Sequence, residues 1–349
     1  MRLVATGSFG VILALAAVLG GFHDAAEAQG EGSAPSDEES YIFGEDNRVE
    51  RHQLDTSDPR YELARSSVAL FSEDLIQMPD GGWLVEGGTL GRNYNLCEGE
   101  RFAEQPAGDR CSGTLVGADL VLTAGHCLAN QEGLSESSAV VESACARMKI
   151  AFDYAYDVEE ADPSRLADED VFQCEKVLAL EYDRTTPSLV PIKSGPWLDY
   201  AIIKLDRPAG GREPVTLQDG AGVEKGRTVT LLGHPSGLPL KIVDGSVARA
   251  AECRNFGFDT DTLTGNSGGG VFDPLTGHAV GVFRGPRAYG YSYDVERKCS
   301  ITGVCGLNVD CSHYPFALAT EIPLILSRLS DEVRAQLEIV EVGGPSKCR

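Results

Sequence analysis

The arrangement of apolar and polar positions changes near residue 66. From there on, apolar residues come in short runs of about four to eight, separated by Gly, Pro, Asp and Asn. Runs of this length are typical of β-strands, because a helix needs a longer amphipathic stretch. The runs predict strands at 67–71, 113–116, 120–123, 149–154, 177–180, 200–205, 228–232 and 278–283.

The predicted strands do not alternate with helices. A parallel sheet would need a helix between successive strands, so the pattern favours an antiparallel, all-β fold. The stretch from 66 to 340 suits two β units of moderate size, with the crossover near 206–211, where Pro and Gly interrupt the pattern.

The C-terminal stretch 322–340 has a different period. Leu326, Leu329, Val333 and Leu337 recur at helical spacing and would share one stripe. The sequence therefore predicts a single C-terminal helix over 322–340 that packs against the sheets.

The N-terminus has the features of an export signal. Arg2 is followed by an apolar run at 9–20, and small residues then end at Ala26-Glu27-Ala28, which fits a cleavage site. The run is shorter than the roughly 20 residues that span a bilayer, which disfavours the alternative of an uncleaved anchor. We expect residues 1–28 to be a signal peptide and the mature chain to be secreted, extracellular or periplasmic, without membrane insertion.

Residues 29–60 are polar, acidic and poor in periodic apolar positions. This composition predicts a linker or pro-segment that is mobile unless it docks onto the rest of the protein.

Composition and charge narrow the function classes. Among 349 residues, 42% are hydrophobic and 24% charged, which excludes a disordered chain. The 30 Lys and Arg face 53 Asp and Glu, and the net charge of −23 would repel nucleic acid and anionic membranes. We therefore expect no nucleic-acid partner. Ten cysteines in an exported chain indicate disulfides.

A glycine cluster surrounds Ser267 in the segment 261–272 (DTLTGNSGGGVF). Glycines on both sides let backbone N–H groups converge while the hydroxyl stays accessible, as an acyl-transfer nucleophile requires. The same letters also satisfy the G-x-S-x-G pattern of an esterase, and a glycine-rich turn without chemistry is the simplest alternative.

His126 stands at the end of a predicted strand pair. Cys111 and Cys127 enclose this pair 16 positions apart, so a disulfide between them would fix the imidazole on a rigid support. A rigidly held imidazole is a suitable general base.

Asp199 lies within the apolar run 197–205 (WLDYAIIKL). An ionised carboxylate there is costly unless it is paired and hydrogen-bonded, and His126 is the expected partner. The alternative is a strand-end Asp that faces solvent.

Together these segments resemble the chymotrypsin/trypsin family of serine endopeptidases. TAGHC is similar to its histidine motif, LDYAIIKL to its aspartate strand and GNSGGG to its serine motif, in the order His, Asp, Ser. An α/β-hydrolase esterase would have the order Ser, Asp, His. GNSGG and YIFGEDNR resemble the bacterial glutamyl endopeptidases in particular.

The resemblance implies a protease domain over 61–340, with two six-stranded antiparallel β-barrels at about 66–206 and 212–321 and the active site between them. Ser267 would be the nucleophile, His126 the general base, and Asp199 the group that orients it. The N–H groups of Gly265 and Ser267 would form the oxyanion hole. The expected partners are protein or peptide substrates, with no metal and no organic cofactor, and the sequence carries no sign of an oligomeric state.

The chain departs from the family beside the serine and in the substrate pocket. Asn266 stands where trypsin-type zymogens carry an Asp that pairs with a new N-terminal amine, so that activation switch should be absent. Asp261 lies six residues before Ser267, where trypsin-type enzymes hold the carboxylate that attracts Arg or Lys, so the resemblance favours cleavage after these residues. The alternative is that Asp261 points elsewhere, because a D-T-x-x-G run also occurs in glutamyl-specific relatives. Phe283 replaces the His of glutamyl-specific relatives, and it joins Arg284 and Gly285 on the expected pocket strand.

Several remaining features allow two interpretations. His234, in a loop at the expected pocket edge, is a turn-packing residue or a substrate contact. The acidic stretch 157–170 is a solvated loop or a calcium site, and Cys145–Cys174 is a plausible disulfide across it. Cys299, Cys305 and Cys311, with His313, predict disulfides that brace an insertion rather than a metal site.

Two further functions compete with an active endopeptidase. The same fold without activity would be a catalytically silent binding module, although all three catalytic groups are present. An esterase of another fold would also carry a reactive serine, but it would not depend on His126.

Overall fold

The computed structural model describes residues 42–72, 74–108, 111–129, 138–182, 198–250, 255–285, 290–309, 316–344 and 348. The expected signal peptide, Cys311 and His313 lie outside the described residues. Of the helices in the described part, none is both long and apolar enough to cross a membrane.

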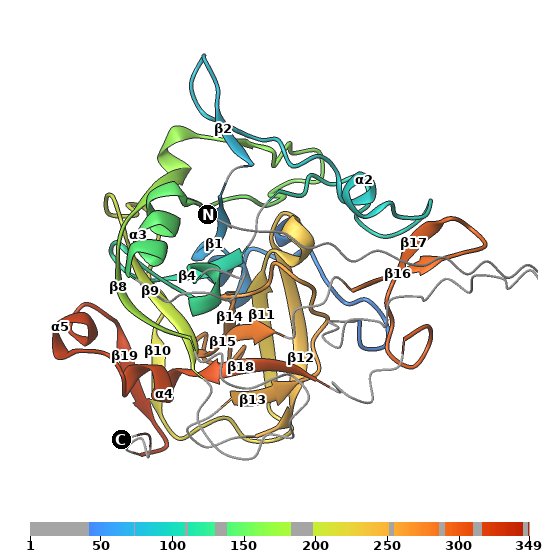
Figure 1. Cartoon of the computed structure of the whole chain (residues 1–349). Helices are drawn as coiled ribbons and strands as arrows, with labels where there is room; N and C mark the ends of the chain where they lie inside the picture. The colour runs from blue at the N-terminus through green and yellow to red at the C-terminus, as the bar shows by residue number, and fades with distance from the viewer. Residues whose placement is uncertain are drawn as a thin grey trace, which may run out of the picture. The chain divides into compact units, whose positions relative to one another are not determined.

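The first barrel is closed and antiparallel, with six strands in the order β1-β4-β5-β9-β8-β6 (Figure 1). Its interior is filled by apolar side chains such as Val68, Leu115, Val121, Ile150 and Ile203. The strands are β1 (Ser67–Phe71), β4 (Cys111–Gly117), β5 (Leu120–Thr123), β6 (Lys149–Ala151), β8 (Val171–Tyr182) and β9 (Asp199–Leu205).

The second barrel belongs to an eight-stranded sheet in the order β14-β11-β12-β13-β18-β15-β10-β19. An additional pairing of β14 with β15 closes the first six of these strands, and β10 and β19 continue the sheet in parallel. The expected all-β fold with two six-stranded barrels is thus confirmed. The strands are β10 (Leu217–Gly220), β11 (Thr228–Gly233), β12 (Lys241–Arg249), β13 (Asn255–Phe258), β14 (Gly270–Phe272), β15 (Ala279–Gly285), β18 (Ala317–Glu321) and β19 (Ile339–Val342).

One apolar cluster contains side chains from both barrels. Leu122 and Tyr200 from the first barrel share it with Leu232, Ile242 and Val282 from the second. Burial of this shared surface fixes the two barrels against each other, and it therefore fixes any site built from both.

The C-terminal stretch is not the single helix that its periodicity predicted. It forms α4 (Ile322–Leu326), α5 (Asp331–Arg334) and then β19. The Ser330 side chain accepts a hydrogen bond from the Val333 N–H and so begins a new helix. The apolar stripe is nevertheless buried at Leu326, Leu329 and Val333, because two short helices can present it as well as one.

Smaller elements surround the barrels. Helix α3 (Ser138–Arg147) is joined to β8 by the Cys145–Cys174 disulfide, which confirms that pairing. The hairpin of β16 (Tyr291–Asp294) and β17 (Cys299–Thr302) is joined by Cys97–Cys299 to the segment after α2 (Leu90–Tyr94). The other elements are η1 (Arg51–Gln53), α1 (Pro59–Ala64), β2 (Leu75–Gln77), β3 (Trp83–Val85), η2 (Gly125–Cys127), β7 (Arg165–Leu166), η3 (Asp168–Asp170) and η4 (Pro235–Gly237).

The expected linker is packed onto the domain from residue 42 onward. Ile42 is 1% exposed and forms a bridge with Val304, while Val49 forms one with Ile242 of β12. Docking of this segment is the alternative that the sequence left open, and it places Val49 against β12 of the second barrel and Arg51 against Asp153 and Asp157.

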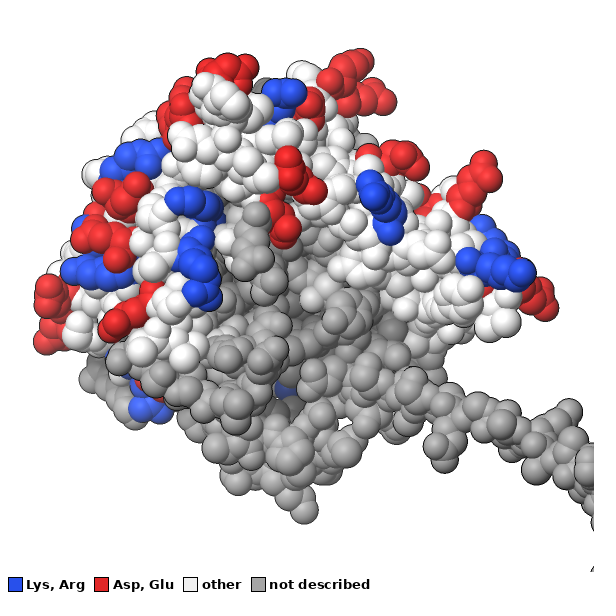
Figure 2. Space-filling view, turned by 45° about the horizontal axis from the view of Figure 1, so that its top comes forward, with Lys and Arg blue, Asp and Glu red and all other residues white. Residues whose placement is uncertain are grey.

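The acidic excess does not gather by sign on the face shown in Figure 2. Acidic and basic side chains are interspersed there. Lys204 with Glu175, and Arg165 with Asp162, are ion pairs on the protein surface. Interspersed basic groups limit the like-charge repulsion that a net charge of −23 would otherwise cause.

Candidate active site

His126 and Asp199 are brought together by strand pairing. β5 and β9 are antiparallel neighbours with Thr123 opposite Ala201, so η2, just after β5, lies beside the first residue of β9. Gly125 makes the close approach possible, because a Cβ there would lie 2.6 Å from the Glu181 carbonyl oxygen.

The Asp199 carboxylate accepts two hydrogen bonds from His126. The backbone N–H donates to Oδ1 at 3.0 Å, and ring Nδ1 lies 2.7 Å from Oδ2. Both residues are buried, at 3% and 1% exposed. Burial alone would raise the pKa of Asp199, but the charge and hydrogen bonds of His126, with a smaller effect of Arg284, hold it below its usual value. The carboxylate therefore stays ionised, and Nδ1 is the donor, which leaves Nε2 to accept a proton.

The predicted disulfide Cys111–Cys127 is confirmed. It ties η2 to β4, so the support of His126 is fixed from two sides. The two sulfurs lie close to His126, but they are bonded to each other and are therefore not thiolate ligands for a metal.

Ser267 lies against the same region of the first barrel. Its carbonyl oxygen accepts a hydrogen bond from the Ser112 N–H at 2.7 Å and lies 3.8 Å from Cys127 Sγ. The next residue, Gly268, has φ +87°, and a Cβ there would lie 2.1 Å from Thr123 Oγ1. Only glycine permits this approach, so the glycine cluster brings Ser267 next to the turn that carries His126.

The amides around Ser267 divide into two sets. Asn266, Gly268 and Gly269 donate to carbonyl groups at 3.2, 2.8 and 2.8 Å. For the N–H groups of Gly265 and Ser267, the described part of the chain provides no backbone acceptor. Two backbone N–H groups that lie beside a serine and donate to no backbone carbonyl in the described part of the chain are the arrangement that can stabilise an oxyanion.

A family comparison agrees with this geometry. The family model described as a trypsin-like peptidase domain matches residues 111–282. This stretch is a trypsin-like serine peptidase domain. His126, Asp199 and Ser267 all lie within it, in the chain order of that family.

Solved structures resemble this chain at low sequence identity. A Glu endopeptidase in complex with MPD is similar to this chain with a TM-score of 0.48 and 16% identity, over 84% of this chain and 100% of its own. A serine endoprotease from Yersinia pestis has a TM-score of 0.37 and 14% identity, over 66% of this chain and 58% of its own. No curated protein matches at the sequence level.

The loop between β11 and β12 packs against the loop that carries Ser267. A Cβ on Gly265, which has φ +95°, would lie 2.4 Å from the His234 carbonyl oxygen. The His234 ring stacks on Tyr154 at 5.6 Å, and its Nδ1 lies 3.1 Å from the Leu238 carbonyl oxygen. Burial lowers the pKa of His234 to about 3, so the ring is neutral. His234 is therefore a turn-packing residue.

Asp261 does not present its carboxylate to a substrate. It is 2% exposed, and its two oxygens accept hydrogen bonds from the backbone N–H groups of Phe43 at 2.7 Å and Asn47 at 2.8 Å. The sequence could not show this, because the donors lie more than 200 positions away and carry no motif.

The other expected pocket residues are also dispersed. Phe283 is fully buried in the core of the second barrel, edge-on to Phe258, so it lines that core instead of a pocket. Arg284 points to the opposite face of the strand, with Nε 3.9 Å from Asp199 Oδ2. Gly285 is buried at the end of β15, where the register with β18 shifts.

Carboxylates of the acidic region pair with arginines. Arg212 contacts Asp153 and Asp170, and Arg51 contacts Asp153 and Asp157. The positive charges of Arg51 and Arg212 hold the pKa of Asp153 below its usual value against the effect of its burial. Asp157 and Asp170 of the stretch 157–170 are thus used for ion pairs with these arginines, together with Asp153 just before it.

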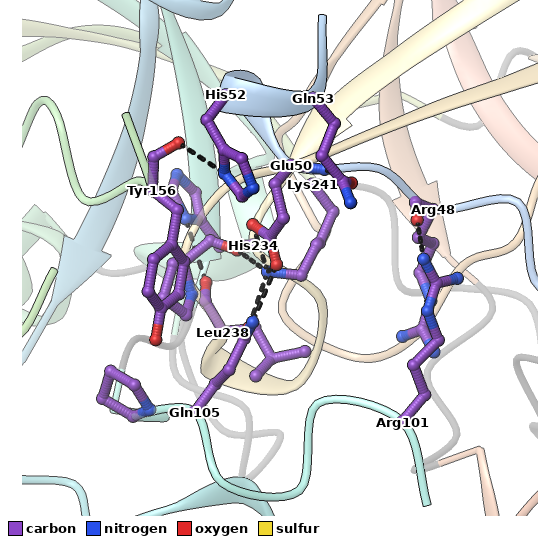
Figure 3. Close-up of polar contacts among 12 residues, drawn as sticks. Arg48, Glu50, His52, Gln53, Arg101, Gln105, Tyr156, His234, Leu238 and Lys241 are labelled. Carbon is purple, nitrogen blue, oxygen red and sulfur yellow. Dashed lines mark hydrogen bonds and ion pairs between the residues drawn. The ribbon is translucent and has the colours of Figure 1, made fainter. Parts of the chain in front are cut away.

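A buried polar network surrounds Lys241. Lys241 is fully buried and donates to Glu50 at 3.1 Å, to Gln105 at 2.9 Å and to the Pro239 carbonyl oxygen at 2.7 Å (Figure 3). Burial lowers the pKa of Lys241 to about 8. Nothing in the sequence marks these residues, since each is an ordinary surface type within its own segment.

Proposed function

We propose that this chain is a secreted serine endopeptidase that hydrolyses peptide bonds through an acyl-enzyme intermediate. The observation that carries the proposal is the buried His126–Asp199 pair, whose Nδ1 donates to the carboxylate and leaves Nε2 as the base. The Ser267 hydroxyl would attack the carbonyl carbon and give its proton to His126, which returns it to the leaving amine.

The amides of Gly265 and Ser267 would stabilise the oxyanion that forms during this attack. Each such donor is worth roughly 3–4 kcal/mol of barrier in related sites. Their lack of backbone acceptors within the described residues supports this role.

Export is supported by two independent features. The signal-like pattern of residues 1–28 precedes the domain, and three disulfides, Cys97–Cys299, Cys111–Cys127 and Cys145–Cys174, need an oxidising compartment to persist.

The preference for Arg or Lys loses its main support. A carboxylate that receives a basic substrate side chain must be reachable, whereas both oxygens of Asp261 already accept amide hydrogen bonds. The proposed endopeptidase therefore has no preference for Arg or Lys that depends on Asp261.

Labelling with a fluorophosphonate tests the proposal, together with a peptide-library cleavage profile. We expect the mature protein to be tagged at Ser267 and to cleave peptides, and we expect Ser267→Ala and His126→Ala to abolish both. Ser246→Ala, on β12, is the control. A folded protein that neither labels nor cleaves would be the catalytically silent binding module, and labelling that survives His126→Ala would show that a group other than His126 activates the serine.

A further inference from the structure

The chain segment Phe43–Gln53, here called the N-terminal arm, is bonded to the loop that carries Ser267. We propose that Asp261 is a positioning residue that fastens the serine loop 259–267 to the N-terminal arm, and that the arm therefore remains part of the mature protease. The inference rests on the proposed function and adds the way in which its serine loop is held.

The contact between loop and arm is made by backbone donors and one side chain. Phe43 N–H and Asn47 N–H donate to different oxygens of Asp261, so the carboxylate bridges two points of the arm. Asp259, two positions earlier in the same loop, instead accepts from Ser246 of the second barrel. Asp261 thus couples this loop to the N-terminal arm.

The arm is itself fixed along its length. Val49 and Ile242 exchange two backbone hydrogen bonds of 3.0 Å, and the Asn47 side chain donates to the Asp244 carbonyl oxygen at 2.9 Å. A carboxylate held by a fixed arm can position the loop, whereas one held by a loose segment would not.

Buried charges make the arm hard to remove. Arg48 and Glu50 are 1% and 4% exposed, and Glu50 is the acidic partner of the fully buried Lys241. Figure 3 shows Lys241 of β12 reaching Glu50 on the arm and Gln105, with Arg48 and Arg101 grouped apart from them. Loss of the arm would leave Lys241 buried without its counter-charge, which is strongly destabilising.

The loop connects Asp261 to the reacting groups within a few residues. Asn266 N–H donates to the Leu263 carbonyl oxygen, which closes a turn between Asp261 and Ser267. Asn266 has no charge with which to bind an ammonium group. Anchoring through Asp261 therefore provides a hold on Gly265 and Ser267 that does not depend on a free N-terminus.

The electrostatics of Asp261 agree with a positioning role. Burial raises its pKa to about 6, even though the amides of Asn47 and Phe43 stabilise the charged form. An ionised carboxylate held at such a cost is more typical of a functional site than of a stabilising contact.

The test compares two pairs of variants, each expressed as the full chain and measured after maturation. Asp261→Asn weakens the bridge, and Asp259→Asn is its control in the same loop. Asn47→Pro removes one amide donor, and Asn47→Ala keeps that donor while removing the side chain. The measurements are the rate of fluorophosphonate labelling, kcat and KM, hydrogen exchange of peptides 43–53 and 259–267, and the mass of the mature N-terminus.

We expect Asp261→Asn to slow labelling and kcat by about tenfold with little change in KM, because the oxyanion amides and Ser267 lose their alignment. Hydrogen exchange of both peptides should rise in Asp261→Asn. The labelling rate and kcat of Asp259→Asn should stay within about twofold of the parent values. Asn47→Pro should slow labelling and kcat as Asp261→Asn does, and Asn47→Ala should slow them less. The mature chain should begin before Phe43.

Three results would overturn the inference. These are an unchanged labelling rate in a folded Asp261→Asn protein, an exchange increase limited to one of the two peptides, and an active mature chain that begins after Asn47. If the parent protein itself does not label, the proposed function fails, and the exchange data alone then decide whether Asp261 couples arm and loop.

Discussion

Asp199 accepts hydrogen bonds from both the backbone and the ring of His126, at 3.0 and 2.7 Å. The two bonds fix the imidazole in position and in tautomer at once. His126 is 3% exposed and Asp199 is 1% exposed. Because both residues are buried, solvent cannot compete for either bond.

Asp199→Asn should lower kcat by about 10⁴-fold while the protein stays folded. The amide can still contact Nδ1, but it has no charge to stabilise the imidazolium and can impose the wrong tautomer. Steady-state kinetics with a peptide substrate measures this. Asp206→Asn, on the exposed turn after β9, is the control, and near-normal activity of Asp199→Asn would remove Asp199 from the mechanism.

Arg284 should help to keep the Asp199 carboxylate ionised at low pH. Its Nε lies 3.9 Å from Asp199 Oδ2, and its positive charge is one of the groups that lower the pKa of Asp199. In Arg284→Gln, kcat/KM should fall more steeply than in the parent as the pH decreases, because the carboxylate is protonated more readily, whereas Arg284→Lys should keep most of the original profile. Coincident profiles for parent and Arg284→Gln would contradict this role.

Lys241 and Glu50 should behave as a coupled pair. Lys241→Met leaves Glu50 buried without its cation and should cost about 3–5 kcal/mol of unfolding free energy. The double variant Glu50→Gln/Lys241→Met removes both charges and should recover most of that loss. Denaturant unfolding of the two single variants and the double variant gives the coupling, and additive effects would show that the pair is not coupled.

Asp261 should make the fold less stable as pH rises. Its pKa in the folded state is about 6, above the ordinary value of 3.8, so the folded state binds its proton more tightly than the unfolded state. Its ionisation should therefore cost up to about 3 kcal/mol, a cost that is absent below about pH 4 and complete above about pH 6.

Unfolding free energies of the parent and Asp261→Asn between about pH 4 and pH 7 check this sign. The variant lacks the ionisation, so it should gain stability relative to the parent as pH rises, although its chemistry is slower. A difference that is constant with pH would contradict the raised pKa of Asp261.

Local sequence was a reliable guide where chemistry and neighbours lie close together in the chain. The short apolar runs predicted an antiparallel all-β fold, and the resemblance to serine endopeptidases implied the two barrels. The apolar surroundings of Asp199 indicated a partner, and the structure confirms the expected pairing with His126. The spacing of Cys111 and Cys127 predicted their disulfide. Periodicity was weaker at 322–340, where Ser330 begins a second helix and 339–342 joins β10 as a strand.

The sequence by itself predicted the six strands of the first barrel, two strands of the second, the candidate nucleophile, base and carboxylate, and the disulfides Cys111–Cys127 and Cys145–Cys174. Each of these depends on side-chain type and spacing over a few residues. Tertiary structure alone decided that Asp261 binds the amides of Phe43 and Asn47, that Cys97 pairs with Cys299 and that Lys241 meets Glu50. These contacts join backbone groups or common side chains across 191 to 218 positions, and such meetings are set by how the chain packs, which local spacing does not encode.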